Sequence, residues 1–106
     1  MIPKYQYRAK IVRWVDGDTV DVDVDLGFRI TTHQRLRLLG VDTPERGQDG
    51  YHEATEFCKT VAPEGAEVVI RTEKSDSFGR YLAHIEVFGR SVADGLLIKG
   101  LAKVYE

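Results

Sequence analysis

The chain has 106 residues, of which 42% are hydrophobic and 30% are charged, and its formal net charge is −2. This length supports one compact domain around one core, so we expect residues 1–106 to form a single domain. The slight negative charge argues against binding to nucleic acid through a general excess of basic residues and leaves a local site as the alternative.

The apolar stretches fall far short of the roughly 20 residues that a membrane span requires, and residues 1–10 lack the apolar core of a signal peptide. We therefore expect a soluble protein without a membrane partner. As written it would be cytoplasmic, and a secreted mature form without its leader stays open. The single cysteine, Cys58, excludes an internal disulfide and a thiolate metal cluster within one chain, and its place on an apolar helix face indicates packing.

Three strands are predicted in the first 40 residues. Residues 5–15 alternate between apolar and polar side chains with a change of parity near Val12, which indicates a bent or bulged strand. Asp16 and Gly17 form a turn dipeptide, and residues 19–26 alternate between apolar and acidic side chains as a half-buried strand does. Residues 29–40 supply a third strand, so the three strands should form a meander.

A loop, a helix and two more strands are expected next. Residues 41–50 are polar and contain proline and glycine, which predicts a surface loop. Residues 51–61 carry apolar side chains at helical spacing and predict one amphipathic helix. Further strands are expected at residues 66–72 and 81–87, joined by a turn at residues 75–80.

The end of the sequence predicts a second, short helix. Ser91 and Asp94 match a variant of the capping box, and Gly100 stands where a helix often ends in a left-handed residue. The order β-β-β-α-β-β with a short trailing helix describes a mainly β chain with helices, of the α+β class. It is typical of a five-stranded Greek-key barrel of the OB-fold type, with its main helix after the third strand and the short helix after the fifth.

Two acidic segments lie at the ends of predicted strands. Asp16 and Asp18 precede the second strand, and Asp42 and Glu45 follow the third. Asp18 shares the parity of the apolar residues, so its carboxylate should point toward the core side and require a cation or hydrogen-bond donors. Turn and capping roles would also explain each acid singly. Together these oxygen ligands favour calcium or magnesium over zinc or copper, and the Thr43 carbonyl could add another oxygen.

Three further acids, Asp21, Asp23 and Asp25, lie on the opposite parity of the second strand. Alternation predicts that they form a solvated face and take no part in the site. The three histidines are scattered without the spacing of metal ligands, so surface or packing roles are expected for them.

Two arginines complete the set of candidate residues. Arg37 closely precedes the second acidic segment, and Arg80 follows the glycine of the predicted turn. Guanidinium groups make forked hydrogen bonds that match phosphate oxygens, although an isolated arginine more often forms a surface salt bridge. A divalent ion, two arginines and a spare carboxylate together supply what phosphodiester hydrolysis requires: polarisation, charge neutralisation and an oriented water.

These residues lie in motifs that resemble the staphylococcal nuclease family. The motifs are DGDT at Asp16–Thr19, RLLGVDTPE at Arg37–Glu45 and DSFGRYLA at Asp76–Ala83, with a fourth, GLAKV, at Gly100–Val104. Their order and the length of the middle motif make the resemblance specific.

The resemblance implies an OB-fold barrel and a calcium-dependent nuclease. Such an enzyme hydrolyses phosphodiester bonds of DNA, RNA or both, as an endonuclease that leaves 3′-phosphate ends. Ca²⁺ would be held by the carboxylates of Asp18 and Asp42 and by the backbone carbonyl of Thr43, while Asp16 would support the ion from close by.

The resemblance also assigns catalytic and substrate-binding roles. Arg37 and Arg80 would bind the scissile phosphate, and Glu45 would position or deprotonate the attacking water. Phe78 stands where the family commonly has tyrosine, which removes a hydroxyl but leaves a ring that can stack on a base. Tyr105 would add another aromatic surface for substrate.

Two other interpretations stay open. One is a noncatalytic OB-fold module that binds nucleic acid or protein, against which the complete catalytic set argues. The other is a calcium-regulated structural role, which leaves both arginines without a purpose. We expect a monomer.

Overall fold

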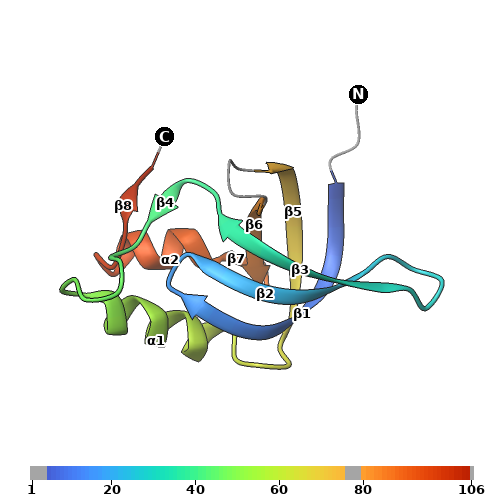
Figure 1. Cartoon of the computed structure of the whole chain (residues 1–106), viewed down its shortest axis with the longest axis horizontal. Coiled ribbons are helices and arrows are strands. Elements are labelled where there is room, and N and C mark those ends of the chain that lie inside the picture. Colours follow the sequence, from blue (N-terminus) through green and yellow to red (C-terminus); the bar gives the residue numbers. More distant parts are fainter. Residues whose placement is uncertain (1–4, 76–79, 106) are drawn as a thin grey trace.

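The computed structural model describes residues 5–75 and 80–105 (Figure 1). Within them the chain forms eight strands and two helices. In chain order these are β1 (Tyr5–Asp16), β2 (Thr19–Asp25), β3 (Thr31–Leu38), β4 (Val41–Asp42), α1 (Tyr51–Val61), β5 (Glu67–Ser75), β6 (Tyr81–Val87), β7 (Arg90–Ser91), α2 (Val92–Ile98) and β8 (Lys103–Val104).

Five strands form a closed barrel. Their order is β3-β2-β1-β5-β6, and a parallel pairing of β3 with β6, from Leu36 opposite Tyr81 to Leu38 opposite Ala83, closes the circle. All other pairings within the barrel are antiparallel. The predicted five-stranded barrel, with its main helix after the third strand and a short helix after the fifth, is therefore confirmed.

Strand β1 is long because it belongs to two parts of the barrel. Its residues 5–10 pair with β5 and its residues 8–16 pair with β2, and its register with β2 shifts between Ile11 and Arg13 and again between Trp14 and Asp16. Bulges of this kind bend a strand and increase its twist, which lets one strand turn the corner of a small barrel. A bulge therefore explains the parity change near Val12, as the sequence predicts.

The core fills the barrel and the space between its end and α1. Inward-facing residues of the five strands are joined by Ala54, Cys58 and Ala62 from the helix region, each fully buried. The indole nitrogen of Trp14 donates to the Ala62 carbonyl at 2.9 Å and so ties β1 to the end of α1. Cys58 has the packing role expected from its place on the helix.

Both ends of α2 have the capping residues that the sequence predicts. The Ser91 hydroxyl accepts a hydrogen bond from the Asp94 backbone N–H at 3.2 Å, and Gly100 has a left-handed φ of 71°. Among the helices that the structure describes, no helix is long and apolar enough to cross a membrane.

Several predicted boundaries are wrong. The third strand is shorter than residues 29–40, since Arg29 and Gly40 have positive φ angles of 62° and 81°. Strand β5 continues to Ser75, where the turn was expected. The two-residue strands β4, β7 and β8 are too short to produce an alternating pattern.

The acidic face of β2 is only partly solvated, and for Asp21 the prediction is wrong. Asp21 is 6% exposed because Arg35 Nε donates to its Oδ1 at 2.8 Å and Arg13 approaches its Oδ2 at 3.8 Å. Both arginines are its direct neighbours across the sheet. Asp23 and Asp25 are exposed as expected.

Candidate active site

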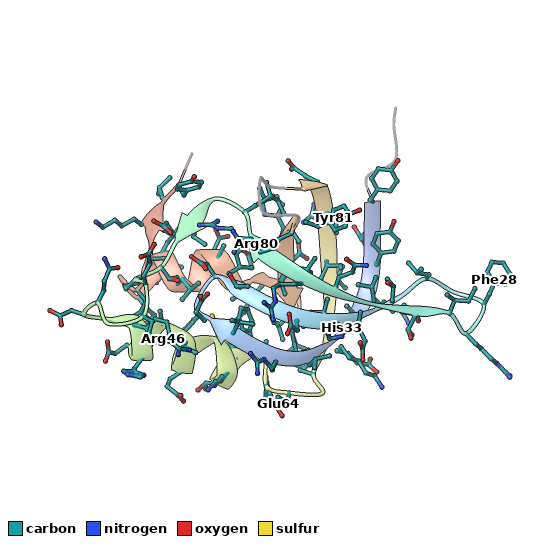
Figure 2. The ribbon with its side chains drawn as sticks, in the orientation of Figure 1. Phe28, His33, Arg46, Glu64, Arg80 and Tyr81 are labelled. Carbon is teal, nitrogen blue, oxygen red and sulfur yellow. The ribbon has the colours of Figure 1, made fainter. Side chains whose placement is uncertain are left out.

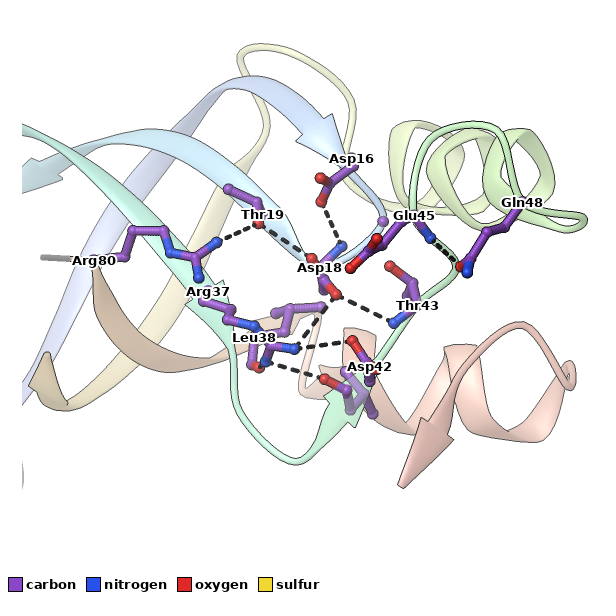
Figure 3. A network of polar contacts seen from close by, with 12 residues as sticks. Asp16, Asp18, Thr19, Arg37, Leu38, Asp42, Thr43, Glu45, Gln48 and Arg80 are labelled. Carbon is purple, nitrogen blue, oxygen red and sulfur yellow. Dashed lines mark hydrogen bonds and ion pairs between the residues drawn. The ribbon is translucent and has the colours of Figure 1, made fainter. Parts of the chain in front are cut away.

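The candidate residues meet where several segments end beside one another (Figure 3). The β1–β2 turn brings Asp18, the end of β3 brings Arg37, and β4 with the following loop brings Asp42 and Glu45. Arg80 directly precedes β6, and the pairing of β6 with β3 places it alongside. Residues more than 60 positions apart in the sequence thus share one site.

Gly17 allows this close approach. A Cβ atom at position 17 would lie 2.9 Å from Ala54 Cβ and 2.9 Å from Thr43 Oγ1, closer than real Cβ contacts allow. The glycine is thus required by the packing of α1 and the Thr43 segment against the turn. The sequence suggested turn chemistry for Gly17, and the contact with α1 gives a second and stricter reason.

Asp18 is the central buried carboxylate. It is 9% exposed, which confirms the inward direction that its parity predicts. Its Oδ1 accepts a hydrogen bond from Thr19 Oγ1 at 3.1 Å, and its Oδ2 accepts one from the Thr43 backbone N–H at 3.2 Å. Arg37 Nη2 lies 3.5 Å from the same Oδ2. The donors and the cation that a buried carboxylate requires are therefore present.

Asp16 and Asp18 differ in acidity. Burial raises the pKa of Asp16, and the neighbouring Asp18 raises it further through a hydrogen bond and its negative charge. Burial also acts to raise the pKa of Asp18, but hydrogen bonds from Asp16 and the Thr43 N–H, with the charge of Arg37, lower it overall. Asp18 is thus the member of the pair that ionises first.

Arg37 is held at the corner between β3 and β4. Its Nη1 donates to the backbone carbonyls of Leu38 at 2.9 Å and Val41 at 3.1 Å. Its Nη2 donates to Asp42 Oδ1 at 3.2 Å and also faces Asp18. The side chain is 12% exposed, so it is far more enclosed than a surface arginine. The guanidinium is therefore fixed by both strands and lies between the two carboxylates.

Tyr105 lies beside Arg37. Strand β8 pairs with β4, and the Tyr105 backbone N–H donates to the Gly40 carbonyl at 3.0 Å. The Arg37 guanidinium carbon lies 4.9 Å from the centre of the Tyr105 ring. The tyrosine is 56% exposed, so one part of it covers the arginine and another faces solvent.

Arg80 is linked to Asp18 through Thr19. Arg80 Nη1 lies 3.3 Å from Thr19 Oγ1, and that hydroxyl donates to the Asp18 carboxylate. Thr19 was not among the residues predicted from the sequence, although its place in the DGDT motif directly after Asp18 is a signal that identifies it. Phe78, the other residue expected near Arg80, lies outside the described residues.

Glu45 projects from a loop that is closed on itself. Its backbone N–H donates to Gln48 Oε1 at 2.8 Å, and its carbonyl accepts from the Gln48 N–H at 2.9 Å. The side chain is exposed, and Figure 3 shows its carboxylate directed toward Asp18 and Asp16. The loop therefore presents Glu45 to the site while it leaves the carboxylate accessible to water.

The oxygen atoms of the site fit a hard divalent cation by their chemistry. In the described ranges, no group of three or more histidine, cysteine, aspartate or glutamate residues is arranged to hold a metal ion. Asp18 and Asp42 nevertheless approach one shared cationic nitrogen, and Thr43 Oγ1 is buried without a hydrogen-bond partner. Carboxylates, backbone carbonyls and hydroxyl oxygens are the donors that calcium and magnesium accept.

Cys58 is close to this site but is not a reactive group. Its Sγ donates to the Gly17 carbonyl at 3.3 Å, and the side chain is fully buried. Burial raises the pKa of the thiol strongly, and the negative charges of Asp18 and Asp16 raise it further. The thiolate that nucleophilic chemistry needs is therefore disfavoured.

Comparisons with known proteins agree with the fold and the motifs. The family model described as staphylococcal nuclease homologue matches residues 35–106. The chain is 31% identical over 101 residues to a protein named thermonuclease from Staphylococcus hyicus, covering 89% of this chain and 57% of that one. It is 32% identical over 99 residues to an uncharacterized endonuclease of Escherichia coli O157:H7, covering 92% of this chain and 61% of that one.

The chain spans about three-fifths of the length of these relatives. The family model nevertheless covers more than half of the chain, including the end of β3, the Asp42–Glu45 segment and Arg80. The chain therefore belongs to the staphylococcal nuclease family.

Proposed function

We propose that the chain is a calcium-dependent nuclease that hydrolyses phosphodiester bonds of DNA, RNA or both, as an endonuclease that leaves 3′-phosphate ends. One observation carries the proposal. Arg37 Nη2 contacts both Asp18 and Asp42, while Arg80 reaches Asp18 through the Thr19 hydroxyl. Groups for a cation and groups for a phosphate are thus combined in one site.

The ion would be held by the carboxylates of Asp18 and Asp42 and by the backbone carbonyl of Thr43, with Asp16 close by. When bound, calcium supplies polarisation of a phosphoryl oxygen and neutralises charge. Asp18 contributes a carboxylate with a lowered pKa, so it is ionised and ready to bind a cation at neutral pH. Asp42 is about half exposed, which keeps the other side of the site open to solvent and substrate.

Arg37 and Arg80 bind the scissile phosphate in this proposal. The carbonyls of Leu38 and Val41 hold the Arg37 guanidinium in one orientation, which lowers the entropy lost when it binds an anion. Negative charge grows on the equatorial oxygens as the phosphorus becomes pentacoordinate. Two forked guanidinium groups stabilise that charge more than they stabilise the starting diester.

Glu45 orients the attacking water and accepts its proton, while the bond between phosphorus and the 5′ oxygen breaks and that oxygen takes a proton from solvent, which leaves the phosphate on the 3′ end. The hydrogen bonds between the Glu45 backbone and Gln48 fix the start of the side chain, and the exposed carboxylate can reach a water molecule above the site. Tyr105 covers one side of Arg37 and offers its exposed part to a sugar or base. Phe78 would add a second aromatic surface.

A cleavage assay tests this function. The protein is mixed with single- and double-stranded DNA and RNA in calcium, magnesium or EDTA, and the ends of the products are mapped. Cleavage that requires calcium and leaves 3′-phosphate ends supports the proposal. Tight binding to single strands without turnover at any calcium concentration would instead identify a noncatalytic OB-fold binding module.

A further inference from the structure

The hairpin between β2 and β3 projects from the barrel (Figure 1), and the side chain of Phe28 lies at its tip (Figure 2). Phe28, at its tip, is 97% exposed, and its neighbours Leu26 and Ile30 are 46% and 55% exposed. Single exposed apolar residues are common on protein surfaces, but three at one projecting tip are unusual and point to a ligand that covers them.

The backbone of the tip is unfavourable for an aromatic residue. Phe28 and Arg29 have φ angles of 53° and 62°, in a turn closed by a 2.9 Å hydrogen bond from the Ile30 N–H to the Gly27 carbonyl. Glycine or asparagine adopts this left-handed conformation at lower cost. A phenylalanine here therefore destabilises the isolated fold, and it gains burial only when something binds the tip.

The outer face of β1, β2 and β3 is more cationic than the chain as a whole. Cross-strand pairing places Arg8 opposite Asp25 and Lys10 opposite Asp23, and Asp21 lies between Arg13 and Arg35. The face and the tip together carry six cationic side chains and four carboxylates, whereas the chain has a net charge of −2. The cationic residues are Arg8, Lys10, Arg13, Arg29, Arg35 and Arg37.

Strand β3 connects this face to the candidate active site. Arg35 and Arg37 share its outer side, and the tip residue Arg29 precedes Arg37 by eight positions. At a rise of about 3.3 Å per residue the tip lies roughly 26 Å from Arg37.

We propose that the β2–β3 hairpin is a binding arm for single-stranded nucleic acid, distal to the active site. A base stacks on Phe28, and the phosphates follow the cationic face from Arg29 toward Arg37. A single strand is favoured over a duplex because its bases are free to stack on an aromatic side chain. The inference extends the proposed function, since the same strand would be cleaved at the active site.

Phe88 offers a matched control. It is 100% exposed and has a φ of 51°, but it lies in the turn between β6 and β7, outside the cationic face. Phe28→Asn and Phe88→Asn both replace a strained aromatic residue by one that tolerates the left-handed conformation. Both variants should therefore fold, with melting temperatures equal to or above that of the unchanged protein.

The test compares kcat/KM for a 20-nucleotide and a 4-nucleotide single strand, in DNA and in RNA. Since stacking of one base on an aromatic side chain is worth about five- to 100-fold in affinity, the ratio of the long to the short substrate should fall by that factor in Phe28→Asn. The ratio of kcat/KM for the 20-nucleotide strand to that for the 4-nucleotide strand should stay unchanged in Phe88→Asn. An unchanged ratio in both variants, or an equal fall in both, overturns the proposal.

Two further measurements separate the alternatives. If the protein cleaves neither substrate, the proposed function fails, and fluorescence anisotropy with the 20-nucleotide strand then tests the arm alone. If Phe28→Asn binds the strand five- to 100-fold more weakly and Phe88→Asn binds it normally, the inference is supported. If sedimentation shows self-association that Phe28→Asn abolishes while strand binding is unchanged, the tip contacts a second copy of the chain and the proposal is overturned.

Discussion

Arg37 Nη2 lies 3.5 Å from Asp18 Oδ2, and both side chains are 12% exposed. The same nitrogen lies 3.2 Å from Asp42 Oδ1, so one guanidinium joins a carboxylate that precedes β2 to one that follows β3, at the end of the hairpin where Thr19 pairs with Arg37. In the proposed mechanism these carboxylates hold the cation and the guanidinium binds phosphate. The contact therefore links the structural and the catalytic roles of the site.

Replacing Arg37 tests this link. Arg37→Ala should lower kcat/KM by about 100- to 1,000-fold, because a preorganised donor to the phosphate is lost. It should also lower the free energy of unfolding by about 1–3 kcal/mol, since Asp18 loses its cationic partner in a buried position. Arg29→Ala, at an exposed tip position, is the control for stability. Full activity of Arg37→Ala would contradict the assigned role.

The Thr19 hydroxyl is predicted to align Arg80 with the site. Thr19→Val keeps the shape of the side chain but removes the group between Arg80 and Asp18, so kcat should fall by about tenfold. Thr60→Val, which removes a hydroxyl from an exposed position on α1, should leave kcat unchanged. Steady-state kinetics on one DNA substrate measure both, and equal kcat values for the two variants would contradict the prediction.

Gly17 is predicted to be required by packing. Gly17→Ala should lower the free energy of unfolding by about 1–3 kcal/mol, because the new Cβ overlaps Ala54 and Thr43. Gly65→Ala is the matched control, since a Cβ there meets open space and the cost is backbone strain alone. Urea unfolding compares them. If the free energy of unfolding falls no more in Gly17→Ala than in Gly65→Ala, the turn accommodates the new Cβ and the prediction is contradicted.

Asp21 should make stability depend on pH. Hydrogen bonds from Arg35 are the largest influence and lower the pKa of Asp21 below its ordinary value in the folded chain. The ion pair therefore contributes its full stability above the unfolded pKa of about 3.9, and the contribution is lost as the pH falls through the lower folded pKa. Asp21→Asn should remove about 1 kcal/mol near pH 6 and less near pH 2.

Urea unfolding at several pH values from 2 to 6 measures this difference. Glu64→Gln, at an exposed position in the turn after α1, is the control. Its free energy of unfolding should equal that of the unchanged protein at each pH. A stability difference between Asp21→Asn and the unchanged protein that stays constant with pH would contradict the assigned ion pair.

Local patterns predicted the parts of this structure that depend on neighbours in the chain. Alternation located the strands and predicted that Asp18 points inward. The spacing of Ser91, Asp94 and Gly100 located α2. These features need only the geometry of a single strand or helix. Asp42 and Glu45 follow one another closely in the sequence, so they could be proposed for the candidate site for the same reason.

Features that depend on cross-strand or tertiary contacts were missed. Asp21 has the parity of a solvated residue, yet Arg13 and Arg35 on the two adjacent strands cover it. The β4–β8 pairing, which brings Tyr105 to Arg37, involves strands too short to show a pattern. Thr19 acts between Asp18 and Arg80 only because the barrel brings β6 alongside β3.

The most direct test of the central claim is cleavage of single-stranded DNA by the unchanged protein and by Glu45→Gln, each in calcium, in EDTA and after calcium is restored. The account predicts that EDTA abolishes cleavage and that calcium restores it. Glu45→Gln should lower kcat by about 100- to 10,000-fold at an unchanged melting temperature. Undiminished cleavage in EDTA, or full activity of Glu45→Gln, would contradict the proposed mechanism.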